Sequence, residues 1–391
     1  MFLRAAVHLQ FCGLVAAQHT TRADVLDCSH SVTAVFWLAI GAALALFVMR
    51  STGQNWASLL RVGSESPARP KIERELGPVV SPDVRGHDGQ IYYLIARDPF
   101  GAGDTAALLA GFDTNPPRYR YRRILYPLLA GGFGHFSGRG TLFGMIALVT
   151  LGMALAAAAI ADLTFQLGLK GGTAFAAIFN LGALLGAMML TADVLALGLA
   201  LAGIALAMRR RTWGAIVFLA LAALTKDIYL LVAISVAAWE WWNRRRSSGI
   251  AIAAGAVLPL VLWSAAVATF IPDAPVKAPP FGLPFAGMFH SIPLWTTRQA
   301  GNGGEMVFAG YVAVTFVLAA VGAAVGRGQA LRFVPPLWIA IAICSTPISV
   351  WDIPSNVARQ FAILWPVGVL LVTRAMRVSE PARCGCRSSL R

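Results

Sequence analysis

Long apolar segments without charged residues constrain the fold more than any other feature of the sequence. Residues 141–161 and 250–271 contain no Asp, Glu, Lys or Arg, and a helix needs about 20 apolar residues to cross the hydrocarbon core of a bilayer. Because lipid offers no hydrogen-bond partner to the backbone, such segments satisfy their N–H and C=O groups within helices. The sequence therefore predicts an all-α polytopic membrane protein.

The composition agrees with this prediction. The chain is 57% hydrophobic and only 13% charged, with a mean hydropathy of +0.67, values outside the usual range of soluble domains. Its net charge of +14 would otherwise suggest a nucleic-acid partner, but the basic residues gather between apolar segments, as they do in membrane proteins. We expect membrane lipids as partners and no nucleic acid.

We predict about ten transmembrane helices, with a range of roughly 9 to 12. They cover residues 32–49, 141–161, 175–190, 194–208, 213–224, 228–241, 250–271, 306–325, 333–350 and 361–373. The predicted domains are a cytoplasmic tail (1–31), a membrane domain (32–373) and a basic cytoplasmic tail (374–391). The membrane domain includes two external loops, 50–140 and 272–304. The first and longer loop is expected to carry short interfacial helices, among them residues 124–130.

The basic clusters predict an orientation. Short loops rich in Arg and Lys stay in the cytoplasm, and such clusters occur at residues 209–211, 244–246, 327–332 and 374–377. A ten-helix topology with both termini in the cytoplasm places every one of them inside. The expected location is the cytoplasmic (inner) membrane, with the polar segments around Asp88, Lys226 and Arg359 together on the external side.

Residues 87–100 form the most distinctive polar segment. Asp88 and the following glycine indicate a turn, apolar residues then recur at helical spacing, and Asp98-Pro99 predicts a stop. We expect a short amphipathic helix with Asp88 at its entrance and with Tyr92 and Tyr93 at a membrane interface. Asp88 either presents its carboxylate to a lipid head group or caps the helix.

Three segments together carry a resemblance to a known family: residues 87–93 (HDGQIYY), 119–127 (YRYRRILYP) and 224–227 (LTKD). They are similar to segments of the GT-C class of integral membrane glycosyltransferases, in particular of a bacterial branch that builds cell-surface glycopolymers. The resemblance implies an inverting hexosyl- or pentosyltransferase that takes a polyprenyl-phosphate sugar donor and a glycan, lipid or protein acceptor. The class commonly carries an adjacent acidic pair where this chain has His87-Asp88. No cofactor is predicted; a divalent metal stays open, without a ligand motif to support it.

The chemistry of such a transfer suggests a role for each polar residue. A carboxylate takes the acceptor's proton and cations stabilise the departing phosphate. Asp88 is the candidate base, although a helix N-terminus favours its ionised form and weakens it as a base. The candidate cations for the donor phosphate are Arg120, Arg122, Arg123, Lys226 and Arg359.

Each of these cations has an alternative interpretation. The arginines at 120–123 suit anionic lipid head groups as well, and the alternative for Lys226 is a simple ion pair with Asp227. Arg359 is also placed to flank a helix without touching a ligand. The expected supporting residues are His87, Gln90, Tyr92, Tyr93 and Asp227, and Asp193 is interpreted as a helix cap. A glycolipid transporter or a non-catalytic partner in polymer assembly remains the alternative function.

Overall fold

The computed structural model describes residues 55–80, 84–112, 115–272, 281–298, 303–326, 329–345, 351 and 353–379. Every named element in these ranges is a helix, and β contacts there are limited to the isolated bridges Val62–Gly86 and Phe281–Ser345. The all-α prediction is therefore confirmed. The predicted tail at 1–31, the predicted helix at 32–49 and the chain after residue 379 lie outside the described residues.

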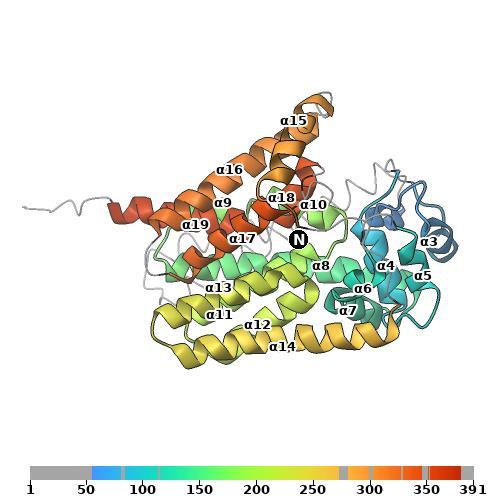
Figure 1. Ribbon diagram of the computed structural model, residues 1–391, viewed down its shortest axis with the longest axis horizontal. Coiled ribbons are helices and arrows are strands. Elements are labelled where there is room, and N and C mark those ends of the chain that lie inside the picture. Colours follow the sequence, from blue (N-terminus) through green and yellow to red (C-terminus); the bar gives the residue numbers. More distant parts are fainter. Residues whose placement is uncertain are drawn as a thin grey trace, which may run out of the picture.

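Short helices before residue 134 gather at one end of the molecule (Figure 1). They are η1 (Trp56–Leu60), α3 (Arg69–Leu76), α4 (Asp88–Arg97), α5 (Thr105–Ala110), α6 (Pro117–Tyr121) and α7 (Leu125–Phe133). The helix α4 begins at the predicted turn and ends at the predicted Asp-Pro stop. The helix α7 corresponds to the predicted interfacial stretch at 124–130.

The remaining described helices include the long apolar ones, joined by several shorter helices (Figure 1). They are α8 (Gly138–Gln166), α9 (Gly171–Ile178), α10 (Leu181–Met188), α11 (Asp193–Met208), α12 (Thr212–Thr225), η2 (Asp227–Tyr229), α13 (Leu230–Trp242), α14 (Arg246–Phe270), α15 (Ala286–Arg298), α16 (Gly303–Val325), η3 (Ala330–Phe333), α17 (Val334–Cys344), α18 (Pro354–Gln360) and α19 (Leu364–Ser379).

Three of the described helices, α8, α14 and α16, are long and apolar enough to cross a membrane. The count rises to five if the bent pairs α9–α10 and α18–α19 each form one span. Other predicted spans coincide with shorter helices: α11 has 16 residues and α12 has 14, fewer than the roughly 20 that a full span needs. The structure thus supports a membrane protein with three to five candidate spans among the described residues, and the predicted count of about ten is not confirmed.

The predicted span at 175–190 is not one straight helix, because Asn180 interrupts it. The side chain of Asn180 caps α10 by accepting a hydrogen bond from the Ala183 N–H at 3.0 Å. Its amide donates to the Ala362 carbonyl at 2.7 Å, and its Oδ1 accepts from the Tyr311 hydroxyl at 3.0 Å. A buried side chain that satisfies three partners fixes the 48° bend between α9 and α10.

Small residues allow the central helices to pack closely. A Cβ added to Gly152 of α8 would lie 2.7 Å from Leu195 Cα, and one added to Gly198 of α11 would lie 2.4 Å from the Gly152 carbonyl oxygen. Glycine therefore lets the backbones of α8 and α11 touch, which is the usual way in which apolar helices associate in lipid.

The helix α4 is buried within protein, so the prediction of an interfacial helix is wrong here. Tyr92 and Tyr93 are 4% and 0% exposed. The Tyr93 hydroxyl donates to Glu75 Oε2 at 2.6 Å, and Arg97 Nε donates to the same oxygen at 2.7 Å. The tyrosine hydroxyl finds a protein acceptor in α3 instead of water, which allows the ring to leave the surface.

Candidate functional site

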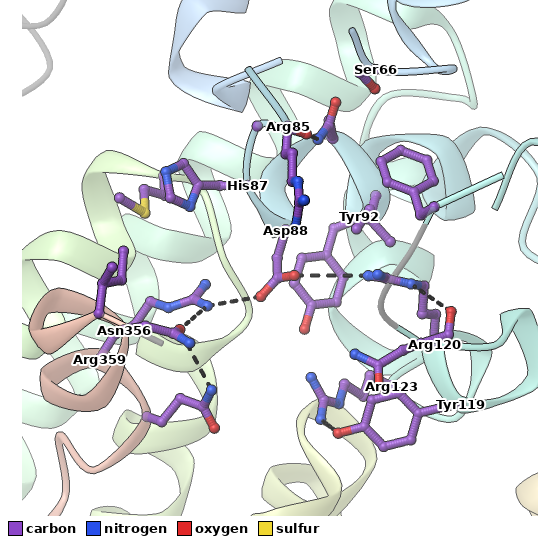
Figure 2. A pocket seen from close by; sticks show the side chains of 18 of the residues that line it. Ser66, Arg85, His87, Asp88, Tyr92, Tyr119, Arg120, Arg123, Asn356 and Arg359 are labelled. Atoms are coloured by element: carbon purple, nitrogen blue, oxygen red, sulfur yellow. Dashed lines mark hydrogen bonds and ion pairs between the residues drawn. The ribbon is translucent and has the colours of Figure 1, made fainter. Parts of the chain in front are cut away.

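One pocket of about 480 Å³ brings together residues that are far apart in the sequence. It lies where the start of α4 faces α6, the end of α10, the α12–η2 turn and α18 (Figure 2). Predicted site residues that line it are His87, Asp88, Gln90, Tyr92, Arg120, Arg123, Lys226 and Arg359. Sequence segments separated by more than 200 residues thus meet at one cavity.

A close backbone approach positions Asp88. The residue that follows it, Gly89, has no room for a side chain: an added Cβ would lie 2.3 Å from the Met189 carbonyl oxygen and 2.9 Å from that of Leu60. The first turn of α4 therefore rests directly on the segment that joins α10 to α11. The N-cap position belongs to His87, which makes no side-chain capping bond.

The Asp88 carboxylate lies between two arginines (Figure 2). Arg359 Nη2 donates to its Oδ2 at 2.9 Å, and Arg120 Nη1 lies 3.8 Å from its Oδ1. The arginine side chains are 8% and 7% exposed, whereas that of Asp88 is 34% exposed. Asp88 thus pairs with two cations of the pocket in addition to its position in the first turn of α4.

The charge of Asp88 is stabilised by its neighbours. Burial by itself would raise the pKa of this carboxyl, but the positive charges of Arg359 and Arg120, with smaller contributions from Arg123 and Lys226, outweigh it and hold the pKa well below its usual range. Asp88 is therefore ionised at neutral pH and, with these contacts in place, is a weak base.

The helix α18 aims Arg359 at the pocket. Pro354 occupies the first turn of this helix, where its missing N–H costs no hydrogen bond. On the opposite side, α10 approaches so closely that a Cβ on Gly182 would lie 2.0 Å from the Ala358 carbonyl oxygen. Arg359 Nη2 also donates to Asn356 Oδ1 at 2.9 Å, so the guanidinium orientation is fixed from within its own helix.

A second carboxylate, Asp193, lies behind the pocket cations. It accepts a hydrogen bond from the Thr191 hydroxyl at 2.6 Å, forms an ion pair with Lys226, and lies 3.4 Å from Arg359 Nη1. The sequence interpretation of Asp193 as a helix cap missed these side-chain partners. A signal was present, because an isolated acid and an isolated base in neighbouring apolar segments are each costly unless they pair.

Arg123 and Asp227 form a second ion pair at the same site. Arg123 Nε donates to Asp227 Oδ1 at 3.1 Å, while its guanidinium lies 4.5 Å from the ring centroid of Tyr119 and donates to that tyrosine's hydroxyl. Lys226 and Asp227 therefore have separate partners, and their predicted mutual pair is wrong.

Three predicted site residues do not line the pocket. Arg122 is exposed and lies outside the pocket lining, so its contact with the donor phosphate stays a prediction. Tyr93 binds Glu75 on the far side of α4, and Asp227 pairs with Arg123 from outside the pocket lining. Gln90 supports the wall, since its amide donates to the Arg85 carbonyl at 2.9 Å and its oxygen accepts from the Gly63 N–H at 3.4 Å.

No protein-family model, curated protein or solved structure matches the chain. The resemblance to GT-C enzymes therefore stays a prediction from short segments. Within the described ranges, no three His, Cys, Asp or Glu side chains lie together as a metal site would require. Both Asp88 and Asp193 instead contact cationic side chains, an arrangement suited to an anionic ligand.

Proposed function

We propose that the protein is a glycosyltransferase that moves a sugar from a polyprenyl-phosphate donor to an acceptor at the outer face of the cytoplasmic membrane. The observation that carries the proposal is the Asp88 carboxylate between Arg359 and Arg120 in a pocket at one end of apolar helices. The pocket volume lies within the range of small-molecule sites.

The cations of the pocket suit the phosphate of the donor. Arg120, Lys226 and Arg359 are buried, yet all three line the pocket. A buried charge is costly unless it is paired. These cations pair with Asp88 and Asp193, and their position at the cavity wall lets an anionic ligand reach them as well. Guanidinium groups match phosphate oxygens through their planar fork of N–H donors.

Asp88 supplies the base of the proposed reaction. It lies at the more exposed part of the site, where an acceptor hydroxyl can approach, while the phosphate binds to the arginines beside it. The acceptor oxygen attacks the anomeric carbon from the face opposite to the phosphate, which inverts the configuration. The cations stabilise the charge that develops on the departing phosphate.

The basic turns support an external site. Arg209 Nε lies 2.9 Å from Asp162 Oδ2, and Arg245 Nη1 lies 3.1 Å from Glu240 Oε2. Both ion pairs lie at the helix ends opposite to those that form the pocket. Trp213 and Trp242 there are 81% and 77% exposed, as expected at a membrane interface. The positive-inside rule assigns this end to the cytoplasm, with both termini, and assigns the long first loop and the pocket to the outside of a topology of about ten helices.

A transfer assay tests the proposal. The purified full-length chain is given radiolabelled polyprenyl-phosphate sugars and a panel of glycan, lipid and protein acceptors, and Asp88→Asn is compared with the wild type. We expect transfer by the wild type and a loss of at least about a hundredfold in the variant, the usual worth of a general base. Equal transfer by both removes Asp88 as the base. Movement of the lipid across vesicles without sugar transfer favours a transporter.

A further inference from the structure

Asp88 poses a chemical problem for the proposed reaction. The arginines that would bind the donor phosphate are the same groups that bind the Asp88 carboxylate: Arg359 Nη2 at 2.9 Å and Arg120 Nη1 at 3.8 Å. A carboxylate and a phosphate present similar oxygens to a guanidinium, so the two compete for one set of N–H donors. While the arginines bind Asp88, it is also a poor acceptor for the proton of an alcohol.

We propose that donor binding replaces Asp88 by phosphate at Arg359 and Arg120, and that this exchange converts the released carboxylate into the base that deprotonates the acceptor. The inference rests on the proposed function and adds an order to it. The donor has to bind before the acceptor hydroxyl is activated.

The surroundings of Arg359 indicate which carboxylate leaves. Arg359 lies between Asp88 at 2.9 Å and Asp193 at 3.4 Å. The Asp193 side chain is only 4% exposed and is also bound to Lys226 and Thr191, whereas Asp88 is 34% exposed. Asp88 is therefore the partner that a ligand entering from the pocket displaces, and Asp193 keeps the guanidinium in position during the exchange.

The charge balance of the site fits one phosphate diester. The buried or half-buried charges are the cations Arg120, Arg123, Lys226 and Arg359 and the carboxylates Asp88, Asp193 and Asp227. They leave one positive charge in excess. A diester with a single negative charge neutralises this excess, and it takes over the contacts of Asp88 without leaving an arginine unpaired.

The exchange also adjusts the basicity of Asp88 in the required direction. Burial raises the pKa of this carboxyl and the cations lower it, so binding the arginines to phosphate leaves burial and a new negative neighbour to raise the pKa. The acceptor O–H then gives its proton to an Asp88 oxygen while the acceptor oxygen bonds to the anomeric carbon. The bond from that carbon to the phosphate oxygen breaks, its electron pair leaves with polyprenyl phosphate, and the proton passes later to water.

Calorimetry with a diester probe tests the exchange without any transfer step. Farnesyl methyl phosphate is suitable because it carries one charge throughout the pH range used, so any protons taken up on binding are bound by groups of the protein and supplied by the buffer. Titrations of the full-length chain between about pH 5 and pH 7, in two buffers of different ionisation enthalpy, count these protons. His87 and the exposed Glu65 also line the pocket, so His87→Gln separates the contribution of the histidine.

We expect the wild type to take up a fraction of a proton that grows as the pH falls, and Asp88→Asn to lose this uptake. The variant should also bind the probe about tenfold more tightly, because an amide competes less well for the arginines than a carboxylate does. The Asp88-dependent uptake should persist in His87→Gln. The matched control Asp162→Asn removes a carboxylate that pairs with Arg209 at the far end of α8, and should behave as the wild type.

The two hypotheses fail in different ways. Unchanged proton uptake in Asp88→Asn, or weaker binding of the probe by that variant, overturns the exchange even if sugar transfer is observed. No binding of the probe to the wild type overturns the exchange together with the polyprenyl-phosphate function. Probe binding with Asp88-dependent uptake supports the exchange, and the separate transfer assay then decides whether the chain is an enzyme.

Discussion

Replacing Asp193 by Asn should destabilise the protein strongly, because it leaves buried cations without their counter-ion. Lys226 and Asp193 are 5% and 4% exposed at their side chains, which makes them a buried ion pair. Removing one partner of such a pair typically costs about 3 to 5 kcal/mol. Arg359 contributes less to the loss, since it keeps Asp88 at 2.9 Å when its contact with Asp193 at 3.4 Å is weakened.

The measurement is the free energy of unfolding in detergent micelles, followed by tryptophan fluorescence during a denaturant titration. The matched control is Asp162→Asn, whose partner Arg209 is 39% exposed, so we expect a loss of no more than about 1 kcal/mol. The double variant Asp193→Asn with Lys226→Met removes the orphaned ammonium and should be more stable than Asp193→Asn alone. Equal losses for the Asp193 and Asp162 variants, or a double variant less stable than either single change, would refute the buried-pair argument.

Two further predictions concern the pocket. Arg123→Gln should lower sugar transfer at least about tenfold, because it removes a cation of the pocket, whereas the neighbouring exposed Arg122→Gln should leave transfer within about twofold; equal losses would contradict the pocket geometry. The lowered pKa of Asp88 also predicts a pH dependence of stability. Its ion pairs stabilise the fold at any pH above the pKa of an unfolded Asp, about 3.9, and this contribution is lost as the pH falls further, through the lower folded pKa. The difference in unfolding free energy between wild type and Asp88→Asn should therefore stay constant from pH 7 to about pH 4 and shrink below it; a difference that already shrinks near pH 6 would be inconsistent.

The sequence predicted the local features of the site well. The turn before residue 90 and the Asp-Pro stop located α4 at Asp88–Arg97, because both signals act through the backbone of a few residues. The grouping of Asp88 with Lys226 and Arg359 followed from the topology, since alternate loops of a helical membrane protein share one face. These inferences needed no knowledge of which side chains touch.

The sequence could not predict features that depend on the direction of a single side chain or on one distant neighbour. Arg122 and Arg123 are adjacent and chemically equal, yet successive residues near a helix point about 100° apart, so one lines the pocket and the other is exposed. The pattern of α4 predicted an amphipathic surface helix. Tyr93 is buried because Glu75 of α3 accepts a hydrogen bond from its hydroxyl. Nothing in the sequence around either residue indicates this contact.

Lys226 and Asp227 show how the backbone decides such pairings. Adjacent charges of opposite sign suggest a mutual pair, but α12 ends at Thr225 and Lys226 is extended, with φ −153° and ψ 113°. Successive side chains of an extended chain point to opposite sides. Lys226 therefore turns to Asp193, and Asp227 turns to Arg123. One extended residue at the end of a helix thus gives two cations of the pocket separate counter-ions, which hold both in position for the anion that we propose they bind.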